Sequence, residues 1–291
     1  MNISTSTPAS DTATATPTAR RRRRLPLLGL VLALALLAGG LTACFPSVGT
    51  RFADPGPYAD IAVQKDADHW IYYPRDLGRD GLLHPVVIWG NGTWLNPAHY
   101  EPLLQHLAKQ GFIVAAAYTS NAGSGREMLA GLDKLTRLNQ DSSSPFYHHV
   151  DVGTVGAMGH SQGGGGALQA AHDPRVDTVV ALEPFLGDAA GVHGPAFFVA
   201  GDRDTTIPAA TVRQRFDASS NIPAAYGEFA NADHITPALD AGAMRGPITA
   251  WLRWHLMVDA TAKRQFVGSN CPYCTSDVFH TYVANAKLQA Y

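Results

Sequence analysis

The stretch Gly159-His160-Ser161-Gln162-Gly163 decides the fold, because it fits the pattern Gly-x-Ser-x-Gly. In that pattern a serine stands in a sharp turn between a strand and a helix. The apolar residues 152–158 predict a short buried strand before the turn, and the glycine- and alanine-rich residues 164–171 predict a helix after it. Glycine on both sides removes the Cβ atoms that would collide in such a turn. The sequence therefore predicts an exposed, nucleophilic Ser161 at the edge of a sheet.

A base and an acid follow the serine along the chain. A serine hydroxyl is a weak nucleophile that needs a base, and the base needs an orienting acid. The apolar run 195–200 ends in a loop with two carboxylates, and the strand-like run 224–230 is followed by Asn231-Ala232-Asp233-His234. Both groups thus come just after a predicted strand, where open α/β sheets hold their reactive residues. The order serine, acid, histidine is that of α/β-hydrolases.

Three motifs together resemble a known family: the elbow Gly-His-Ser-Gln-Gly-Gly, the loop Gly-Asp-Arg-Asp-Thr and the turn Asp-His. They are similar to the bacterial polyesterase–lipase–cutinase group of α/β-hydrolases, which is close to dienelactone-hydrolase-like esterases. The resemblance covers roughly residues 61–255. It implies Ser161 as nucleophile, Asp204 as acid and His234 as base.

Two alternatives to Asp204 stay open for the acid. Asp202 lies in the same loop, and we expect it to cap or buttress that loop instead. Glu183 is the other, because some α/β-hydrolases take their acid from the end of the strand after the elbow helix. Among the remaining histidines, His160 precedes the nucleophile and is expected to point away from it.

The developing oxyanion needs two backbone N–H donors. Gln162, directly after the serine, is one of them. The loop 90–93 after a predicted strand supplies the other, from Asn91 or, in the alternative register, from Thr93.

Aromatic residues near these loops are predicted to bind the substrate. They are Trp89, Trp94 and Phe185, which we expect to line an acyl or aryl pocket. The cutinase-like relatives usually carry a tryptophan where Phe185 stands and a methionine where Gln162 stands. These two differences alter the presumed acyl pocket but leave ester hydrolysis intact.

The N-terminal residues 1–43 are predicted to be a signal peptide. Five arginines at 20–24 precede the apolar stretch 25–38, and Leu41-Thr42-Ala43-Cys44 matches a bacterial lipobox. Cys44 is then the lipidated first residue of an exported protein that is anchored to a membrane in the cell envelope. A transmembrane anchor is the alternative, but the apolar run is shorter than the ~20 residues that span a bilayer.

The rest of the chain has the length of one α/β domain. We expect a linker at 44–58, the hydrolase domain at 59–262 and a C-terminal tail at 263–291. Without residues 1–43 the chain has 17 basic and 23 acidic residues, a net charge of −6. That sign disfavours nucleic-acid binding.

The tail contains the motif Cys271-Pro272-Tyr273-Cys274. A structural disulfide between Cys271 and Cys274 is expected, because exported chains meet oxidising conditions. A thioredoxin-like redox role would need the motif at a helix N-terminus near a first strand. Zinc binding would need His280 as a further ligand.

Alternating strand and helix patterns predict a doubly wound, mostly parallel sheet. Strands are expected at 61–64, 69–73, 84–89, 112–118, 152–158, 176–182, 196–200 and 224–230, and helices at 97–110, 126–138, after Ser161 and at 247–257. The connection 185–195 is too short for a large cap domain.

These observations predict an exported, lipid-anchored serine hydrolase that cleaves short or medium acyl esters, and polyesters as a further class, through an acyl-enzyme. A non-catalytic surface lipoprotein, a peptidase and an acyltransferase are the alternatives. We expect no metal, no organic cofactor and a monomer.

Overall fold

The computed structural model describes Met1 and residues 51–291. The predicted signal peptide, Cys44 and the first part of the predicted linker lie outside the described residues. All of the described helices and strands belong to one compact unit, Thr42–Tyr291.

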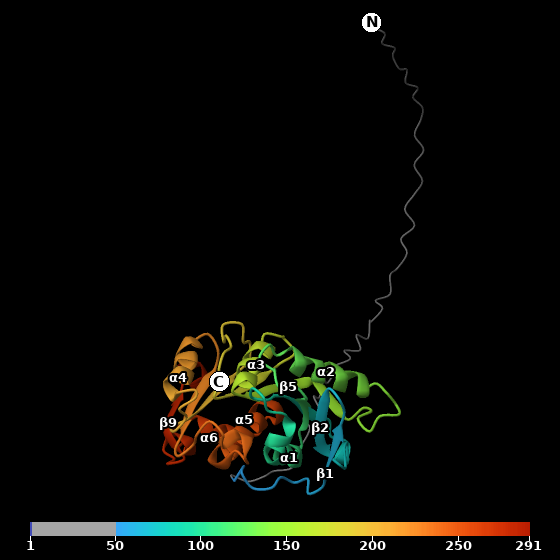
Figure 1. Cartoon of the computed structure of the whole chain (residues 1–291), viewed down its shortest axis with the longest axis horizontal. Helices are drawn as coiled ribbons and strands as arrows, with labels where there is room; N and C mark the ends of the chain where they lie inside the picture. Colours follow the sequence, from blue (N-terminus) through green and yellow to red (C-terminus); the bar gives the residue numbers. More distant parts are fainter. Residues whose placement is uncertain (2–50) are drawn as a thin grey trace, which may run out of the picture. The chain divides into compact units, whose positions relative to one another are not determined.

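The described residues build one mixed sheet in the order β1-β2-β4-β3-β5-β6-β7-β8-β9. Figure 1 shows β1 and β2 towards one side of this sheet and β9 at the other side. The six neighbouring strands from β4 to β8 run parallel, whereas β1, β2 and β9 pair antiparallel at the two sides. The central strands are nearly continuous apolar runs, as expected for parallel strands covered on both faces. The strands are β1 Ile61–Lys65, β2 His69–Pro74, β3 His84–Gly90, β4 Ile113–Ala117, β5 Val150–His160, β6 Thr178–Leu182, β7 Ala196–Gly201, β8 Ala224–Phe229 and β9 Phe279–Ala284.

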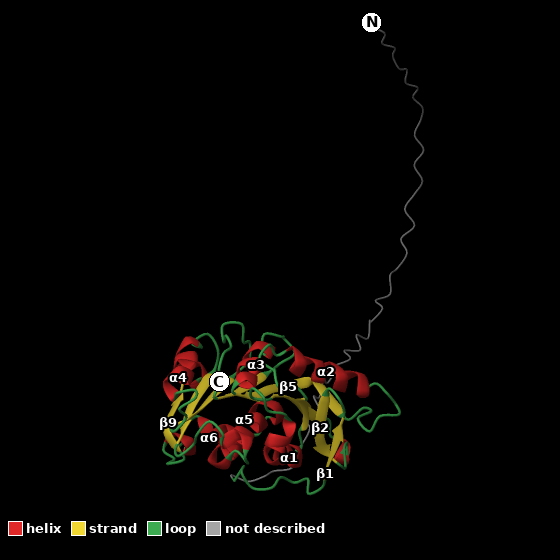
Figure 2. Cartoon of the chain, viewed as in Figure 1, coloured by secondary structure: helices red, strands yellow, loops and turns green. Residues whose placement is uncertain are grey.

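Helices cover both faces of this sheet (Figure 2). On one face α2, α3 and α4 pack against the strands, and on the other α1, α5 and α6 do so. The helices are α1 Glu101–Lys109, α2 Arg126–Leu138, α3 Gln162–Ala170, α4 Ala209–Ala218, α5 Arg245–Met257, α6 Ala260–Phe266 and α7 Ala286–Gln289. The predicted α/β-hydrolase fold with a doubly wound, mostly parallel sheet is thus confirmed.

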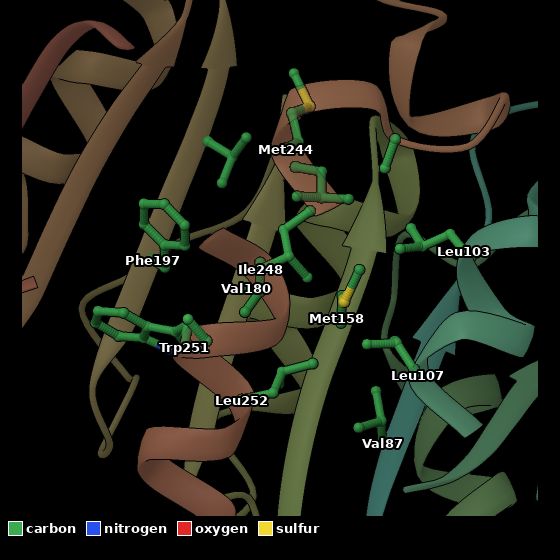
Figure 3. Packing of buried hydrophobic residues seen from close by; sticks show 14 of the residues in the cluster. Val87, Leu103, Leu107, Met158, Val180, Phe197, Met244, Ile248, Trp251 and Leu252 are labelled. Atoms are coloured by element: carbon green, nitrogen blue, oxygen red, sulfur yellow. The ribbon is translucent and has the colours of Figure 1, made fainter. Parts of the chain in front are cut away.

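The larger of the two hydrophobic cores lies under α1 and α5. Figure 3 shows Leu103 and Leu107 of α1 and Ile248 and Trp251 of α5 facing the apolar side chains of the central strands. Strand residues of this core are Val87, Met158, Val180 and Phe197. Both cores hold the parallel strands at a fixed register, so the loops at their C-terminal ends start from a rigid frame.

The predicted elements are present, with small shifts at their ends. The helix predicted at 97–110 begins as a 3₁₀ turn, Pro97–Tyr100, before α1 starts. No cap domain is inserted between β6 and β7, where the described chain has only loop and turn structure.

Two domain boundaries differ from the expectation. The residues 263–291 are not a tail outside the domain, because β9 pairs with β8 and Leu288 is buried in the core. At the other end Phe52 and Tyr58, in the predicted linker, are also buried. Phe52 and Leu288 both belong to the hydrophobic core that lies under α1 and α5. The strand and helix pattern of the central domain gives no sign of these contacts.

Within the described part of the chain, no helix combines the length and the apolarity that are needed to cross a membrane.

Candidate active site

Ser161 occupies the tight turn between β5 and α3. Its φ is 56°, a left-handed conformation that non-glycine residues seldom adopt. Its N–H donates to Leu182 O at 2.9 Å, and its carbonyl accepts from Gly165 N at 3.1 Å. The flanking glycines are required for packing, because a Cβ on Gly159 would lie 2.2 Å from Gly163 O and one on Gly163 only 2.1 Å from Gly90 O. The turn therefore fits tightly against the end of β3.

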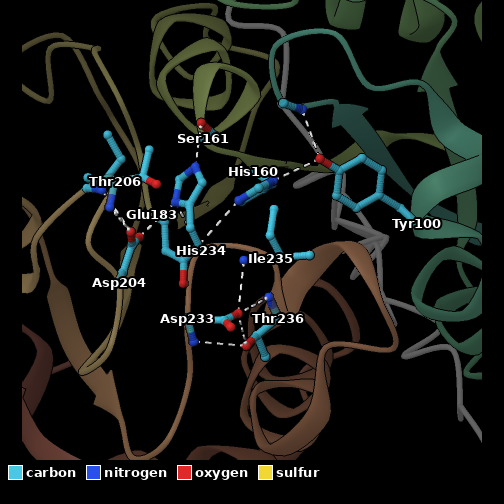
Figure 4. Close-up of polar contacts among 12 residues, drawn as sticks. Tyr100, His160, Ser161, Glu183, Asp204, Thr206, Asp233, His234, Ile235 and Thr236 are labelled. Atoms are coloured by element: carbon cyan, nitrogen blue, oxygen red, sulfur yellow. Dashed lines mark hydrogen bonds and ion pairs between the residues drawn. The ribbon is translucent and has the colours of Figure 1, made fainter.

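The structure brings Ser161, His234 and Asp204 into one chain of hydrogen bonds (Figure 4). Ser161 Oγ lies 3.0 Å from His234 Nε2, and Asp204 Oδ2 lies 2.7 Å from His234 Nδ1. With Nδ1–H donating to Asp204, Nε2 is free to accept the hydroxyl proton of Ser161. Both distances are within hydrogen-bond reach, as nucleophilic catalysis requires.

Two turns hold the acid and the base in place. Asp204 Oδ1 accepts the backbone N–H groups of Thr206 and Ile207, each at 2.8 Å, so that Oδ2 is left for the histidine. Asp233 Oδ1 accepts from the N–H groups of Ile235 and Thr236 at 3.1 and 3.0 Å and fixes the turn that carries His234. Asp202 is exposed and does not contact His234, so of the two loop carboxylates only Asp204 reaches the base.

Glu183, the third candidate for the acid, also reaches the base. It follows β6 directly and its side chain is fully buried. Its Oε2 lies 3.3 Å from His234 Nδ1 and 3.2 Å from His160 Nε2. The structure thus places two carboxylates beside the same imidazole nitrogen, with Asp204 the nearer.

These carboxylates control the protonation of His234. Burial by itself lowers the pKa of the imidazole, but the hydrogen bond to Asp204, the contact with Glu183 and the charges of both outweigh burial and raise the pKa to about 9. The histidine is therefore strongly biased towards the imidazolium form that a proton-accepting step would create.

His160 does not point away from the site as expected. Its ring lies 4.7 Å from the His234 ring between centroids, and its Nδ1 lies 2.8 Å from Tyr100 Oη. Tyr100 Oη in turn accepts the N–H of Gly92 at 3.0 Å. The reason lies in the tertiary structure. The His160 side chain packs between the turn that precedes α1, which carries Tyr100, and the end of β6, which carries Glu183. A local sequence pattern does not indicate this packing.

Asn91, whose backbone N–H is predicted to hold the oxyanion, has a side chain with a structural role. It is fully buried, its Oδ1 accepts from Trp89 Nε1 at 2.8 Å, and its Nδ2 donates to Ala117 O and Thr119 O at 2.6 and 2.9 Å. These bonds pin the end of β3 to the end of β4. Gly92 and Thr93 line the cavity beside Ser161 instead, and the Gly92 N–H is already used by Tyr100. Because Thr93 lines this cavity and Asn91 does not, we take the alternative register, with Thr93, as the proposal.

A cavity of about 350 Å³ opens above the serine. Of the three aromatic residues predicted to bind substrate, Phe185 lines it and is 49% exposed. Trp89 is fully buried in the core, and Trp94 is 85% exposed outside the lining. The other lining residues are Gly92, Thr93, Leu95, His160, Ser161, Thr206, Ile207, His234 and Ile235.

Sequence reasoning missed several of these lining residues. Ile207 and Ile235 are apolar residues in otherwise polar loops, directly after the acid and the base, and that signal could have found them. Leu95 and Tyr100 carry no such signal. A larger cavity of about 470 Å³, at the N-terminal ends of β6–β8, is lined by none of the candidate residues.

The remaining predictions concern the disulfide and metal binding. Cys271 and Cys274 are joined by a disulfide across a short 3₁₀ turn. Among the described residues, His160, Glu183 and His234 are the group with metal-ligand spacing. The proton on His234 Nδ1 is needed for the bond to Asp204, so these residues do not fit a resident metal ion.

Comparison with known proteins agrees with this geometry. The model of the family described as PETase, PET hydrolase-like, matches residues 66–285. A bis(hydroxyethyl) terephthalate hydrolase from Streptomyces coelicolor is 32% identical over 75% of this chain and 72% of its own. The cutinase est1 of Thermobifida alba is 29% identical over 69% and 68%, and cutinase 2 of Thermobifida cellulosilytica is 28% identical over 63% and 71%.

Both kinds of name denote enzymes that hydrolyse carboxylic esters, in agreement with the enzyme class expected from the three motifs. Because the family model matches more than half of the chain, this protein belongs to the PET hydrolase-like family, a cutinase-like group of α/β-hydrolases that act on carboxylic esters.

Proposed function

We propose that this protein hydrolyses carboxylic esters through an acyl-enzyme on Ser161. The observation that carries the proposal is the hydrogen-bonded chain from Ser161 Oγ through His234 to Asp204, at 3.0 and 2.7 Å. A binding protein has no need of a nucleophile, a base and an acid in this order. The ester hydrolases among the relatives support the same reaction class.

The reaction has two halves with the same residues in each. Ser161 Oγ attacks the ester carbonyl while His234 Nε2 takes its proton, and Asp204 stabilises the imidazolium that forms. His234 then gives this proton to the leaving alcohol, which departs and leaves the acyl group on Ser161. Water, activated by the same nitrogen, attacks the acyl-enzyme and releases the acid.

The oxyanion of each tetrahedral intermediate would be held by the N–H groups of Gln162 and Thr93. Gln162 is the first residue of α3, so its N–H stands at the positive end of the helix dipole. Thr93 lines the same cavity as Ser161. Losing one such donor typically lowers kcat by about 10²–10³-fold.

The cavity favours esters with an apolar or aryl acid part. Leu95, Phe185, Ile207 and Ile235 supply the apolar lining, and no cap closes over them. We therefore propose short and medium acyl esters and aryl diesters as substrates, with soft polyesters as a further class because an uncapped site admits polymer-attached groups. Hydrolysis should start below the solubility limit of the substrate, without a jump in rate at an interface.

Purified protein tests this directly. It should hydrolyse p-nitrophenyl butyrate and bis(hydroxyethyl) terephthalate, and a fluorophosphonate probe should label Ser161 with loss of activity. Ser161→Ala should remove both activity and labelling while the circular dichroism spectrum is retained. Absence of hydrolysis and of labelling in the folded wild-type protein would favour the non-catalytic alternative, and turnover by Ser161→Ala would exclude Ser161 as the nucleophile.

We also propose export and lipid anchoring at Cys44, supported by the lipobox Leu41-Thr42-Ala43-Cys44 after the arginines and the apolar stretch. One myristoyl-sized chain gives a membrane-binding constant of only about 10⁴ M⁻¹, so stable anchoring needs more than one acyl chain. Protein produced with its own N-terminus in a bacterium that processes lipoproteins should partition into detergent and carry a lipid mass on its first mature peptide. Cys44→Ser should lose both properties; an unmodified Cys44 in the wild type would contradict the proposal.

A further inference from the structure

Glu183 has an unusual backbone conformation at the end of β6. Its φ is 46°, in the left-handed region, although it precedes Pro184 and such residues normally stay extended. Its N–H donates to Val199 O at 2.8 Å, which fixes it between β6 and β7. Non-glycine residues keep such conformations only where the surrounding structure holds them, and they are concentrated at functional sites. The conformation directs the carboxylate inward, towards the two histidines.

The Glu183 carboxylate is buried and short of hydrogen-bond partners. Its side chain is 0% exposed, and neither oxygen has a well-formed hydrogen bond. His160 Nε2 and His234 Nδ1 lie 3.2 and 3.3 Å from its Oε2. Burying an ionised carboxylate is unfavourable unless it is paired with a cation. The cation that the reaction creates here is the His234 imidazolium.

The other neighbour is held in one tautomer. Tyr100 Oη accepts from Gly92 N, so its own proton is available for His160 Nδ1 at 2.8 Å. Burial raises the pKa of Tyr100, which keeps the phenol protonated. His160 Nδ1 then accepts, and His160 Nε2 faces Glu183 Oε2 at 3.2 Å. A chain of polar contacts thus runs from the loop beside the oxyanion to the base.

Asp204 and Glu183 have different relations to the same Nδ1–H. Asp204 is nearer, at 2.7 Å against 3.3 Å, and its second oxygen is fixed by two backbone N–H groups. Glu183 has no such bonds, so its carboxylate is free to take over the Nδ1–H when Asp204 no longer accepts it.

We propose that Glu183 is a second carboxylate for the catalytic histidine, a positioning residue that supports His234 beside Asp204 and sustains part of the reaction when Asp204 is lost. The inference rests on the proposed ester hydrolysis by Ser161. It differs from the triad assignment because it gives two acids to one base.

The pH profile is the first readout. The groups that face His234 are Asp204, Glu183, His160 and Ser161, with Tyr100 behind His160. Because the pKa of His234 is raised to about 9, the neutral base is present only at high pH, so kcat/KM should rise with pH up to about 9. Glu183→Gln removes one of the two negative charges that raise this pKa. The midpoint should then move to lower pH by about one unit or more, since nearby opposite charges shift a pKa by about 1–3 units.

The second readout is a double-mutant cycle in kcat. Where one acid serves the histidine, its change to the amide lowers kcat by about 10⁴-fold. With Glu183 in reserve, Asp204→Asn should lose only about 10²-fold, and Glu183→Gln less than about tenfold with KM unchanged. The double variant should lose at least about 10⁴-fold, which is more than the product of the two single losses.

Glu228→Gln is the matched control. Glu228 accepts from Tyr226 Oη at 2.9 Å on β8 and has no contact with the site. It should leave kcat and the pH midpoint unchanged. Glu183→Asp, which keeps the charge, should restore part of the shifted midpoint. A Glu183→Gln profile equal to that of the wild type, or a double variant equal to Asp204→Asn, would overturn the proposal.

A direct titration of His234 by NMR separates this inference from the proposed function, because it needs no turnover. In Ser161→Ala protein the His234 ring should titrate near pH 9, and with Glu183→Gln added it should titrate lower. If the wild type fails to hydrolyse any ester while this shift is seen, the proposed function is wrong, whereas the pairing of Glu183 with His234 stands. If Glu183→Gln does not fold, the same titration is made in Glu183→Met, which also removes the charge and should titrate lower, and an unchanged value overturns the proposal.

Discussion

The catalytic edge of the sheet and the C-terminal segment from α6 to α7 differ in the kind of side chain that they bury. The catalytic edge holds Ser161 and Glu183 at positive φ, with buried polar groups that face one another. The C-terminal segment holds apolar and aromatic side chains: Phe279 lies 4.5 Å from Phe229 between ring centroids, and Leu288 is fully buried. Strained backbone and buried charge are unfavourable for stability. The C-terminal segment contributes apolar burial without contacting the cavity, so changes at the two regions should separate activity from stability.

With Ser161 in place, the largest effect of a single substitution on kcat is expected from the acid. Asp204→Asn should lower kcat by about 10²-fold, because His234 loses its nearest acceptor and Glu183 replaces it only in part. Asp202→Asn, on an exposed carboxylate two residues away, should stay within about twofold. Steady-state hydrolysis of p-nitrophenyl butyrate measures both, and a larger loss for Asp202→Asn would show that the acid is wrongly assigned.

Phe279→Ala should lower the stability of the protein and leave its activity unchanged. Removing a buried phenylalanine typically lowers the free energy of unfolding by about 3–5 kcal/mol, from lost apolar burial and the cavity left behind. The kcat of the protein that remains folded should stay within about twofold of the wild type. Urea denaturation measures the first quantity, with Ser161→Ala as the comparison that loses activity but changes stability by less than about 1 kcal/mol. A large loss of kcat in folded Phe279→Ala would mean that the two regions are coupled.

Phe185→Ala should have a smaller effect, on substrate binding. Burying a whole phenylalanine side chain contributes about 1.5–3 kcal/mol, and half of this ring is already covered in the free protein. We therefore expect KM for aryl or long-chain esters to rise about fivefold, which corresponds to about 1 kcal/mol. The KM for acetate esters should change less. Equal changes for all esters would indicate that Phe185 supports the fold and not the substrate.

Removing the disulfide should have the smallest effect on activity and a modest effect on stability. Cys271 and Cys274 are three residues apart, so the bond closes a very short loop and constrains the unfolded chain little. Cys271→Ser with Cys274→Ser should cost about 1–2 kcal/mol and lower Tm by a few degrees, with kcat unchanged. Differential scanning calorimetry with and without a reductant checks this; a loss of activity on reduction would instead favour a redox role for the pair.

The sequence by itself determined which residues form the nucleophile, the acid and the base, and their order along the chain. The strand–turn–helix around Ser161, the loop with Asp204 and the turn with His234 are each local patterns. Because the carboxyl ends of parallel strands meet at one edge, the three were expected to meet as well. Exposure and long-range packing are not local, and there the expectations failed: Trp89 is buried in the core and Trp94 lies outside the cavity.

Only the tertiary structure decided the rest. β9 pairs with β8 at the edge of the sheet. The sequence of residues 279–284 alone does not reveal this pairing, because it depends on the free edge of β8. Likewise, Glu183 and His160 became neighbours of the base through packing between strands that are distant in sequence. Local patterns determine which residues follow a strand, whereas the side chains that share a buried space depend on how the strands are ordered and packed.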